Sequence, residues 1–422
     1  MREFDRPEGI AYLKVIAVGG VPVVSLHYLD GSVRARLLTK EPVHGPLLTA
    51  EMQRVAESLG LGGRIVSIDA IEHDVWTVHQ RFDPHRPLWR TEMAGASARV
   101  IYLSGTTGEV VQETTLAERS WNLAGAVIHW WYLPWLRRRW ALWDQTLWWV
   151  GALSTGMALT GVWVCLRHLI YDGWSRCSGG PRALHRTLGE IGGVAVVCWV
   201  VSGWLFMDHG RWFSDGKVST LERERAMGGR MTVRDLVESS GVLSQMTAEG
   251  TVKELRLTKM AGTLYVVVRE SPRYQSVLAL THREGQAREE FSDEAALASV
   301  RAMLGEASPL TVRRSHGADR RRGSTLTREG LPPVLRVERQ DPSHLWVDVD
   351  ARTGEILEIL DPSRRAFHSL FDLLHRWEAP WFAGHEDIRR IMMAVWCGLS
   401  AGLAVSGFRI WAKRRSVSKV MR

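Results

Sequence analysis

Three stretches of this 422-residue chain are apolar and free of charge over lengths that suit a membrane. Residues 147–166 give 20 such positions in a row, 191–207 give 17, and 391–408 give 18. The hydrocarbon core of a bilayer is roughly 30 Å thick and needs about 20 residues of helix, with about 17 at the lower end. Glycine and serine inside these runs favour close packing of helices in lipid. The pattern therefore predicts three transmembrane helices.

Tryptophan is concentrated at the ends of the three runs. The chain has 20 tryptophans. Those near the runs are Trp130, Trp131, Trp135, Trp140, Trp143, Trp148, Trp149, Trp377, Trp381 and Trp411. Tryptophan favours the membrane interface, where its ring lies among headgroups and its N–H stays hydrated. A buried helix of a soluble core does not account for such flanks, so we interpret the chain as an integral membrane protein.

The polar regions on either side of these runs predict α+β structure. Apolar residues recur at helical spacing over 49–60 and 293–305. Alternating patterns around Gly108 and Gly354 predict two hairpins, and 252–270 predicts another strand–turn–strand. The basic, Gly- and Ser-containing stretch 313–330 predicts a loop.

Basic residues predict which side of the membrane each region occupies. Arg167, Arg176, Arg182 and Arg186 near the link between the first two runs, and the basic tail 413–422, mark a cytoplasmic side. Both large polar regions are then extracytoplasmic, although Arg137–Arg139 argue mildly against this. The first 20 residues are charged and contain no adequate apolar stretch. We therefore expect that a preceding helix is absent from this chain.

Charge and cysteine content exclude other classes. The formal net charge is +8, but the basic residues are scattered or lie beside the apolar runs, so nucleic acid is not an expected partner. The four cysteines lie in or beside the runs and form no CxxC pair. A disulfide framework or a thiolate metal site is therefore not expected.

The chain repeats itself at an offset of 246 residues. "TGEVVQETTLAERSWNLAGAVIHWWYLPW" from Thr107 aligns without a gap to "TGEILEILDPSRRAFHSLFDLLHRWEAPW" from Thr353. The alignment superposes His129 on His375, and Thr160-Gly161 on Ser406-Gly407. A match over about 80 residues indicates internal duplication. The unit is a polar domain, an aromatic segment with a histidine, and a membrane span.

These features give a complete division of the chain. We expect an extracytoplasmic domain (1–120), an aromatic histidine segment with the first span (121–170), a cytoplasmic loop (171–186) and the second span (187–209). A second extracytoplasmic domain (210–365), a second histidine segment with the third span (366–412) and a cytoplasmic basic tail (413–422) complete it.

The motifs resemble one family. "VDVDARTGEILEIL" after a short helix resembles the PepSY domain. With "LLHRWEAPWF" or "VIHWWYLPWL", a following span containing Ser-Gly or Thr-Gly, and "ALHRTLGEIGGV" (183–194), it resembles the PepSY-associated transmembrane proteins. This bacterial inner-membrane family includes reductases of ferric siderophores that carry haem b. The resemblance implies an α-helical membrane protein with two periplasmic PepSY-like α+β domains. Family members usually have four spans, whereas three are present here.

The resemblance implies a haem b site, and the repeat suggests its ligands. Haem held by two histidines needs imidazoles on facing helices, an apolar slot and aromatic packing. His129 and His375 are equivalent in the repeat, so we expect them to pair on one iron near the outer face. His185 lies at the inner end of the second span, with its partner expected on the absent helix. Trp131, Trp135, Trp377 and Trp381 are expected to frame the pocket; no metal other than haem iron is expected.

Each histidine also has a simpler interpretation. His129 and His375 can be interfacial residues bonded to backbone or headgroups, and His185 can contact lipid phosphates. His168 flanks the first run without a matching pattern in the repeat, and His209 follows the second run.

Two functions are compatible with these features. The first is an inner-membrane haem protein that transfers electrons across the membrane to reduce a ferric siderophore. Siderophores hold Fe(III) through hard oxygen donors, and reduction loosens the iron. No flavin or nicotinamide motif is found, so the electron donor is expected to be a quinol or a cytoplasmic reductase. The alternative is a non-enzymatic membrane protein that binds or senses a periplasmic peptide, peptidase or envelope component.

Overall fold

The structure is a computed structural model that describes residues 9–18, 21–37, 49–58, 64–171, 180–248, 252–271, 274–280, 287–305, 309–315, 333–382 and 385–420. The chain divides into two compact units. Unit 1 comprises residues 1–140, 216–317 and 327–361, and unit 2 comprises residues 141–215, 318–326 and 362–422.

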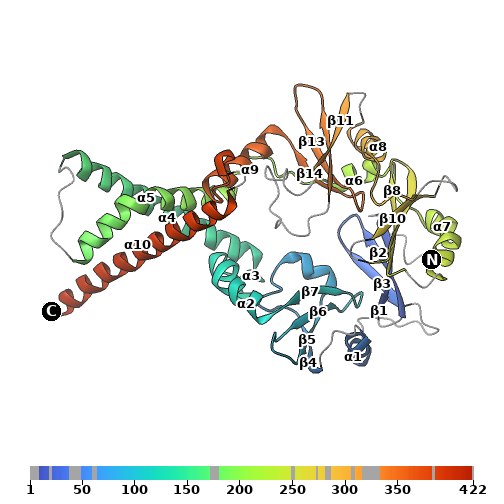
Figure 1. Ribbon diagram of the computed structural model, residues 1–422, viewed down its shortest axis with the longest axis horizontal. Helices are drawn as coiled ribbons and strands as arrows, with labels where there is room; N and C mark the ends of the chain where they lie inside the picture. Colours follow the sequence, from blue (N-terminus) through green and yellow to red (C-terminus); the bar gives the residue numbers. More distant parts are fainter. Residues whose placement is uncertain are drawn as a thin grey trace. The chain divides into compact units, whose positions relative to one another are not determined.

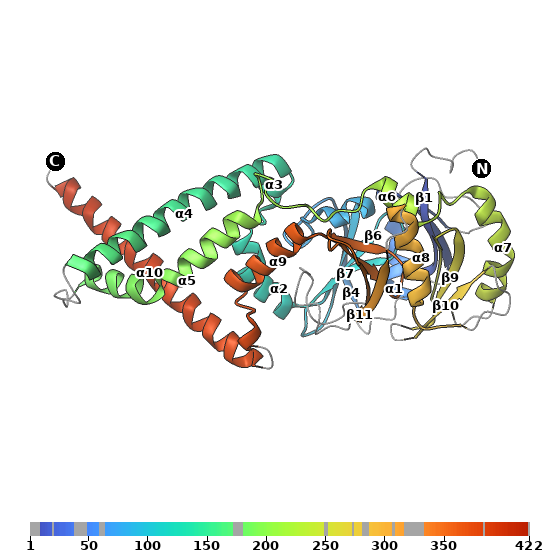
Figure 2. The ribbon, with the colours of Figure 1, turned by 90° about the horizontal axis from the view of Figure 1, so that it is seen from above.

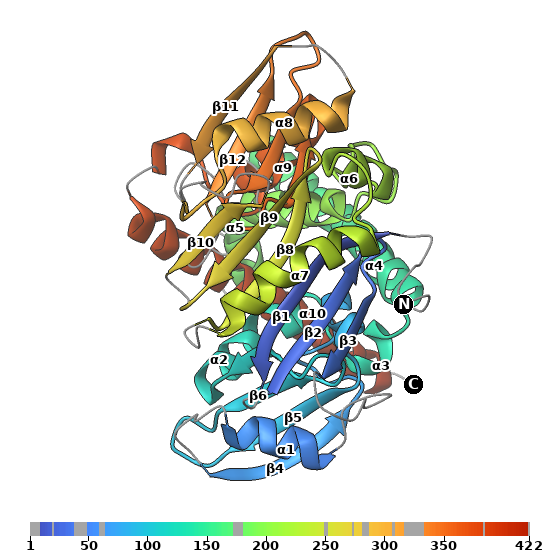
Figure 3. The ribbon, with the colours of Figure 1, turned by 90° about the vertical axis from the view of Figure 1, so that its right-hand side faces the viewer.

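A six-stranded antiparallel sheet lies in unit 1, in the order β10-β9-β8-β1-β2-β3. Its strands are β1 (Ile10–Val18), β2 (Val21–Tyr28), β3 (Val33–Leu37), β8 (Glu254–Met260), β9 (Thr263–Arg269) and β10 (Gln275–Ala279). Helix α7 (Val233–Ala248) crosses one face of this sheet (Figure 3). Its Leu236 and Leu243 pack against a buried cluster that includes Leu13 and Leu255.

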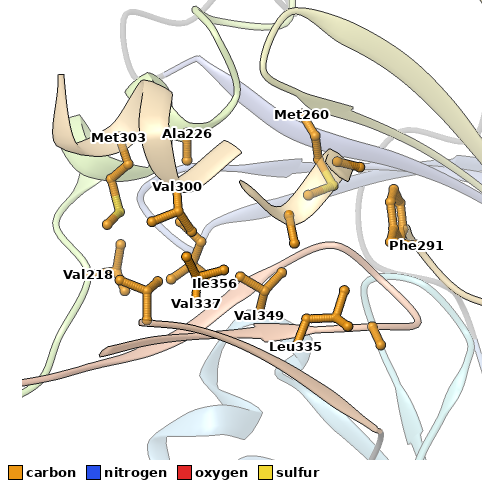
Figure 4. Close-up of a cluster of buried hydrophobic side chains, with 14 of the residues drawn as sticks. Val218, Ala226, Met260, Phe291, Val300, Met303, Leu335, Val337, Val349 and Ile356 are labelled. Atoms are coloured by element: carbon orange, nitrogen blue, oxygen red, sulfur yellow. The ribbon is translucent and has the colours of Figure 1, made fainter. Parts of the chain in front are cut away.

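Two four-stranded antiparallel sheets complete unit 1. One contains β4 (Ile65–Ile71), β5 (Leu88–Met93), β6 (Val100–Ser104) and β7 (Val110–Thr114), with helix α1 (Thr49–Ser58) and the 3-10 helix η2 (Gln80–His85). The other contains β11 (Leu310–Ser315), β12 (Val334–Arg339), β13 (Trp346–Asp350) and β14 (Ile356–Leu360), with helices α6 (Thr220–Ala226) and α8 (Asp293–Leu304). Figure 4 shows Val300 and Met303 of α8 beside Leu335, Val337 and Val349 of the second sheet.

The sequence repeat is also a repeat of backbone structure. β12, β13 and β14 have the same lengths as β5, β6 and β7, and each begins 246 residues later. Positive φ angles recur at the same offset in Ala98 and His344, in Gly108 and Gly354, and in Trp131 and Trp377. The first three strands also recur as β8, β9 and β10, with β3 and β10 separated by 242 residues.

The six-stranded sheet joins the two copies of the repeat. β1 pairs with β8, and the register sets Lys14 opposite Arg256. Lys14 Nζ donates to Glu109 at 2.6 Å, and Arg256 donates to Glu355. These two glutamates occupy equivalent positions in the hairpins that the sequence predicts. The segments 1–120 and 210–365 therefore contribute strands to one sheet, which the sequence pattern did not indicate.

Unit 2 is built on three long helices, α4 (Trp140–Tyr171), α5 (Pro181–Phe206) and α10 (Glu386–Val420) (Figures 1 and 2). All three are long and apolar enough to cross a membrane, which confirms the predicted membrane-length helices. The polar flanks of each apolar run continue the helix at one or both ends. The amphipathic helix α9 (Pro362–Leu374) and the 3-10 turn η5 (Pro380–Phe382) precede α10.

The predicted α+β structure of the polar regions is confirmed. α1 and α8 lie within two residues of the predicted helices 49–60 and 293–305. The hairpins around Gly108 and Gly354 are β6–β7 and β13–β14. The predicted loop 313–330 is wrong for residues 313–315, which form the end of β11, and its remaining residues lie outside the described part of the chain. In unit 1, helix α2 (Leu116–Asn122), the π-helical turn η3 (Leu123–Val127) and helix α3 (Pro134–Arg137) follow β7.

Candidate functional site

His185 of α5 is held by α10. Its Nδ1 lies 2.9 Å from Ser406 Oγ and 3.2 Å from the carbonyl oxygen of Leu403. The Ser406 hydroxyl itself donates to Leu403 at 2.8 Å. When the serine proton is used in that bond, the matching tautomer has the hydrogen on Nδ1 and the lone pair on Nε2. A Cβ added to Gly407 would lie 3.2 Å from His185 Cε1, so the imidazole rests on a Ser-Gly pair.

His375 is held in the same way by the other end of α5. Its Nδ1 lies 3.0 Å from Ser202 Oγ, and the Ser202 hydroxyl donates to the carbonyl of Trp199 at 3.2 Å. A Cβ on Gly203 would meet the ring at 3.5 Å. The Trp199 indole N–H donates to the backbone oxygen of His375 at 2.9 Å, and the imidazole stacks on Phe371 with centroids 4.7 Å apart.

Both histidines therefore share one arrangement. Each directs Nδ1 at a serine of a neighbouring helix and rests on the glycine that follows. A hydrogen bond from Nδ1 to a neighbouring oxygen fixes the tautomer of metal-binding histidines and leaves Nε2 for the metal. His185 and Ser202 are 17 residues apart on α5, about 26 Å along a helix. The two imidazoles thus lie at opposite ends of α5.

A cavity of about 1160 Å³ lies among α4, α5 and α10. Glycines on all three helices line it, namely Gly161, Gly189, Gly193 and Gly407. A Cβ on Gly189 would lie 3.7 Å from both Cys165 of α4 and Leu403 of α10. The polar side chains that line the cavity include His168, His185, Arg182 and Arg186. No acidic residue is among the described residues that line it.

These residues fit a haem at the His185 end of α5. The cavity supplies a largely apolar slot with small-residue walls, and His185 supplies an imidazole that its contact with Ser406 orients. His375 makes the equivalent contact with Ser202 but is not among the residues that line this cavity. His185 and His375 therefore belong to separate sites.

The predicted ligand His129 belongs to unit 1, where it follows the π-helical turn η3. It is exposed and meets Trp130 edge-on, with centroids 5.7 Å apart. His375 belongs to unit 2, and the pairing of the two histidines stays a prediction.

The tryptophans expected to frame the pocket differ in their surroundings. Trp131 and Trp377 both adopt a left-handed backbone, with φ of 48° and 54°, a conformation uncommon outside glycine. Trp377 contacts Trp199 and Trp396, with centroids 6.0 Å apart in each case. Trp135 and Trp381 are exposed. Of the four, Trp377 is the one with aromatic neighbours on membrane-length helices.

The structure gives the surroundings of two further histidines of unit 2, His209 and His168. His209 Nε2 lies 2.6 Å from Asp144, and its ring stacks on Trp148 with centroids 5.2 Å apart. That nitrogen is therefore engaged within the protein. His168 lines the same cavity as His185. The 246-residue repeat gave no signal for His168, since the equivalent residue is Arg414.

No group of three or more His, Cys, Asp or Glu side chains in the described part of the chain is arranged to hold a metal ion. A scan of the chain against models of known protein families finds no match, and a search of curated proteins finds none either.

Proposed function

We propose that this chain is a b-type haem protein of the bacterial inner membrane, which passes electrons across the bilayer to a ferric siderophore on the periplasmic side. The observation that carries the proposal is the pair of imidazoles at opposite ends of α5. Each has Nδ1 bonded to a serine on a neighbouring helix, so each presents Nε2. One of them faces a cavity of about 1160 Å³ between membrane-length helices.

In this proposal the histidines at the two ends of α5 bind separate haems. His185 would hold a haem at the inner end of α5, and His375 would hold one at the outer end. The haem supplies a one-electron carrier, whose chemistry belongs to the cofactor. Ser406 and Ser202 keep the imidazoles in the ligating tautomer, and the glycines of the cavity leave room for a planar group.

The proposed substrate follows from the chemistry of iron. A ferric siderophore that accepts one electron becomes a ferrous complex, which oxygen donors hold less strongly. The electron comes from a quinol or a cytoplasmic reductase. In this proposal unit 1 forms the periplasmic part, with its two PepSY-like domains joined by the six-stranded sheet, and binds the chelate.

The test is a spectrum followed by a reduction assay. The full chain, produced with ample haem, should purify with a b-type spectrum, and His185→Ala and His375→Ala should each remove part of it. His209→Gln is the matched control, because His209 is engaged by Asp144, and it should leave the spectrum unchanged. Reduced protein mixed anaerobically with a ferric hydroxamate should be reoxidised and release Fe(II) to a ferrous chelator. Colourless protein would end this proposal and favour the partner-binding alternative.

A further inference from the structure

The second histidine in the cavity has no role in the function proposed so far. His168 of α4 and His185 of α5 come from consecutive helices, and both line the cavity among α4, α5 and α10. We infer that the haem proposed for the His185 end of α5 would be held between these two side chains, with His168 as a second ligand of its iron. This inference rests on the proposed function and identifies a ligand that the repeat does not contain.

Depth along the helices supports the pairing. His168 lies three residues before α4 ends at Tyr171, and His185 lies four residues after α5 begins at Pro181. At the rise of an α-helix these positions are about 4.5 Å and about 6 Å from the ends that residues 172–180 connect. Two consecutive helices joined by a short link therefore bring the two imidazoles to a similar level. Figure 1 shows the C-terminal end of α4 standing apart from the N-terminal end of α5.

The walls of the cavity suit a flat apolar ring. Gly161, Gly189 and Gly407 contribute no side chain beyond the backbone, and Phe408 and Trp411 of α10 are aromatic. Aromatic side chains pack favourably against a macrocycle. His185 is already oriented, because Ser406 fixes its Nδ1.

The positive charges that line the cavity suit the propionate edge of a haem. Haem b carries two propionate carboxylates, and arginine is well suited to pair with carboxylates. Arg182 and Arg186 line the cavity from the α5 face that carries His185. Arg186 also contacts Glu190 at 2.7 Å, so Arg182 is the first candidate for a propionate partner. A free cation would be disfavoured beside these two arginines.

The experiment uses the full chain loaded with haem and follows iron spin state. Unaltered protein should show only low-spin, six-coordinate iron by electron paramagnetic resonance and resonance Raman spectroscopy. His168→Gly should convert one haem to a high-spin, five-coordinate form, and added imidazole should restore the low-spin signal. Such rescue identifies a vacated ligand position, which a structural role of His168 would not produce. Should His168→Gly fold poorly, His168→Gln, with a closer match in size, serves for the spin-state measurement.

Cys165→Ala is the matched control. Cys165 lies one helical turn from His168 on α4 and lines the same cavity, and its loss should leave the spin state unchanged. High-spin iron in Cys165→Ala would assign the ligand to the thiolate and overturn the inference. Low-spin iron retained in His168→Gly but lost in His185→Ala would also overturn it while leaving the proposed function standing. Absence of haem from the unaltered protein would instead remove the proposed function itself.

Discussion

At the scale of single residues, unit 1 contains a buried ion pair between Arg336 and Asp348. Arg336 and Asp348 face each other across β12 and β13, and each is less than a tenth exposed. Their two hydrogen bonds measure 2.7 and 2.8 Å. In the first copy of the repeat the same pair is Arg90 and Tyr102, and the Tyr102 hydroxyl donates to Asp74 at 2.6 Å. The second copy thus buries its arginine against a carboxylate, whereas Arg90 is only partly buried and pairs with Glu92 at 2.6 Å.

Asp348→Ala should destabilise unit 1 by about 3–5 kcal/mol, because it leaves the Arg336 guanidinium buried without its carboxylate. Chemical denaturation of the full chain measures the change. The control is Glu113→Ala, which removes an exposed ion pair with Arg99 and should cost less than about 1 kcal/mol. Equal losses in the two variants would show that the buried pair has no special weight. The double variant Arg336→Met/Asp348→Leu should recover much of the lost stability.

His27 makes a second prediction at this scale. Its ring stacks on Tyr12 with centroids 4.2 Å apart, and burial lowers its pKa from 6.5 to about 4. The unfolded chain therefore takes up a proton between about pH 6.5 and about pH 4 that the folded protein does not. Stability should fall as the pH falls through this window, by about 2 kcal/mol at about pH 5.

His27→Phe keeps an aromatic ring against Tyr12 and removes the titration. Denaturation at about pH 7.5 and about pH 5 should show a larger acid-induced loss in the unaltered protein than in the variant. The difference between the two losses isolates His27 from other groups that titrate in acid. The same loss in both proteins would contradict the role given to His27.

At the scale of elements, sequence and structure agree where the signal is local. The hairpins around Gly108 and Gly354 were predictable because each turn needs a left-handed residue, and glycine is the residue that adopts this conformation most readily. Both glycines have φ of 73° in the structure. The three long helices were predictable because a continuous apolar run of membrane length can satisfy all its backbone hydrogen bonds in lipid by forming a helix. Their polar flanks extend α4 and α10 well past the predicted 147–166 and 391–408.

The helix contacts that form the candidate site were not predictable in this way. Nothing in the spacing of α5 indicates that His185 meets Ser406, because the choice of neighbouring helix is a tertiary property. A signal was nevertheless present in the sequence. Each histidine rests on a Ser-Gly pair, 202–203 or 406–407, and Thr160-Gly161 is equivalent to the second of these pairs in the repeat.

The glycine of this pair gives an element-scale prediction. A Cβ at Gly407 would lie 3.2 Å from His185, tighter than ordinary contact, whereas a Cβ at Gly398 on the same helix meets nothing within 4 Å. Both alanine variants gain about the same helix propensity, up to about 1 kcal/mol. Gly407→Ala should therefore be less stable than Gly398→Ala by about 1–2 kcal/mol, because the His185 ring must move.

Thermal unfolding of the full chain in detergent compares the two variants. The haem spectrum gives an independent measure, since a displaced His185 should lower haem content in Gly407→Ala and leave it unchanged in Gly398→Ala. Equal behaviour of the two variants would show that the contact between Gly407 and His185 carries no weight.

At the scale of the whole molecule, strand pairing constrains membrane topology. β1 precedes α4 and β8 follows α5, yet the two strands are direct neighbours in one sheet. Segments that share a sheet must lie on the same side of a membrane, so if α4 and α5 span a membrane, one must cross it and the other must return. The distribution of basic residues in the sequence also predicts that the two large polar regions lie on one side of the membrane. The shared sheet could not be predicted, because it pairs strands more than 200 residues apart in the chain.

Labelling of single cysteines tests this topology. Ser97 and Ser343 are exposed, occupy equivalent positions in the repeat, and lie on opposite sides of α4 and α5 in the chain. In a background without the four native cysteines, Ser97→Cys and Ser343→Cys should both react with an impermeant maleimide in intact cells. Ser418→Cys in the basic tail should react only after the cells are permeabilised, because α10 adds a third crossing. Labelling of Ser97→Cys and Ser343→Cys from opposite sides would be incompatible with the six-stranded sheet, whereas labelling of both from the cytoplasm would keep the sheet and reverse the orientation.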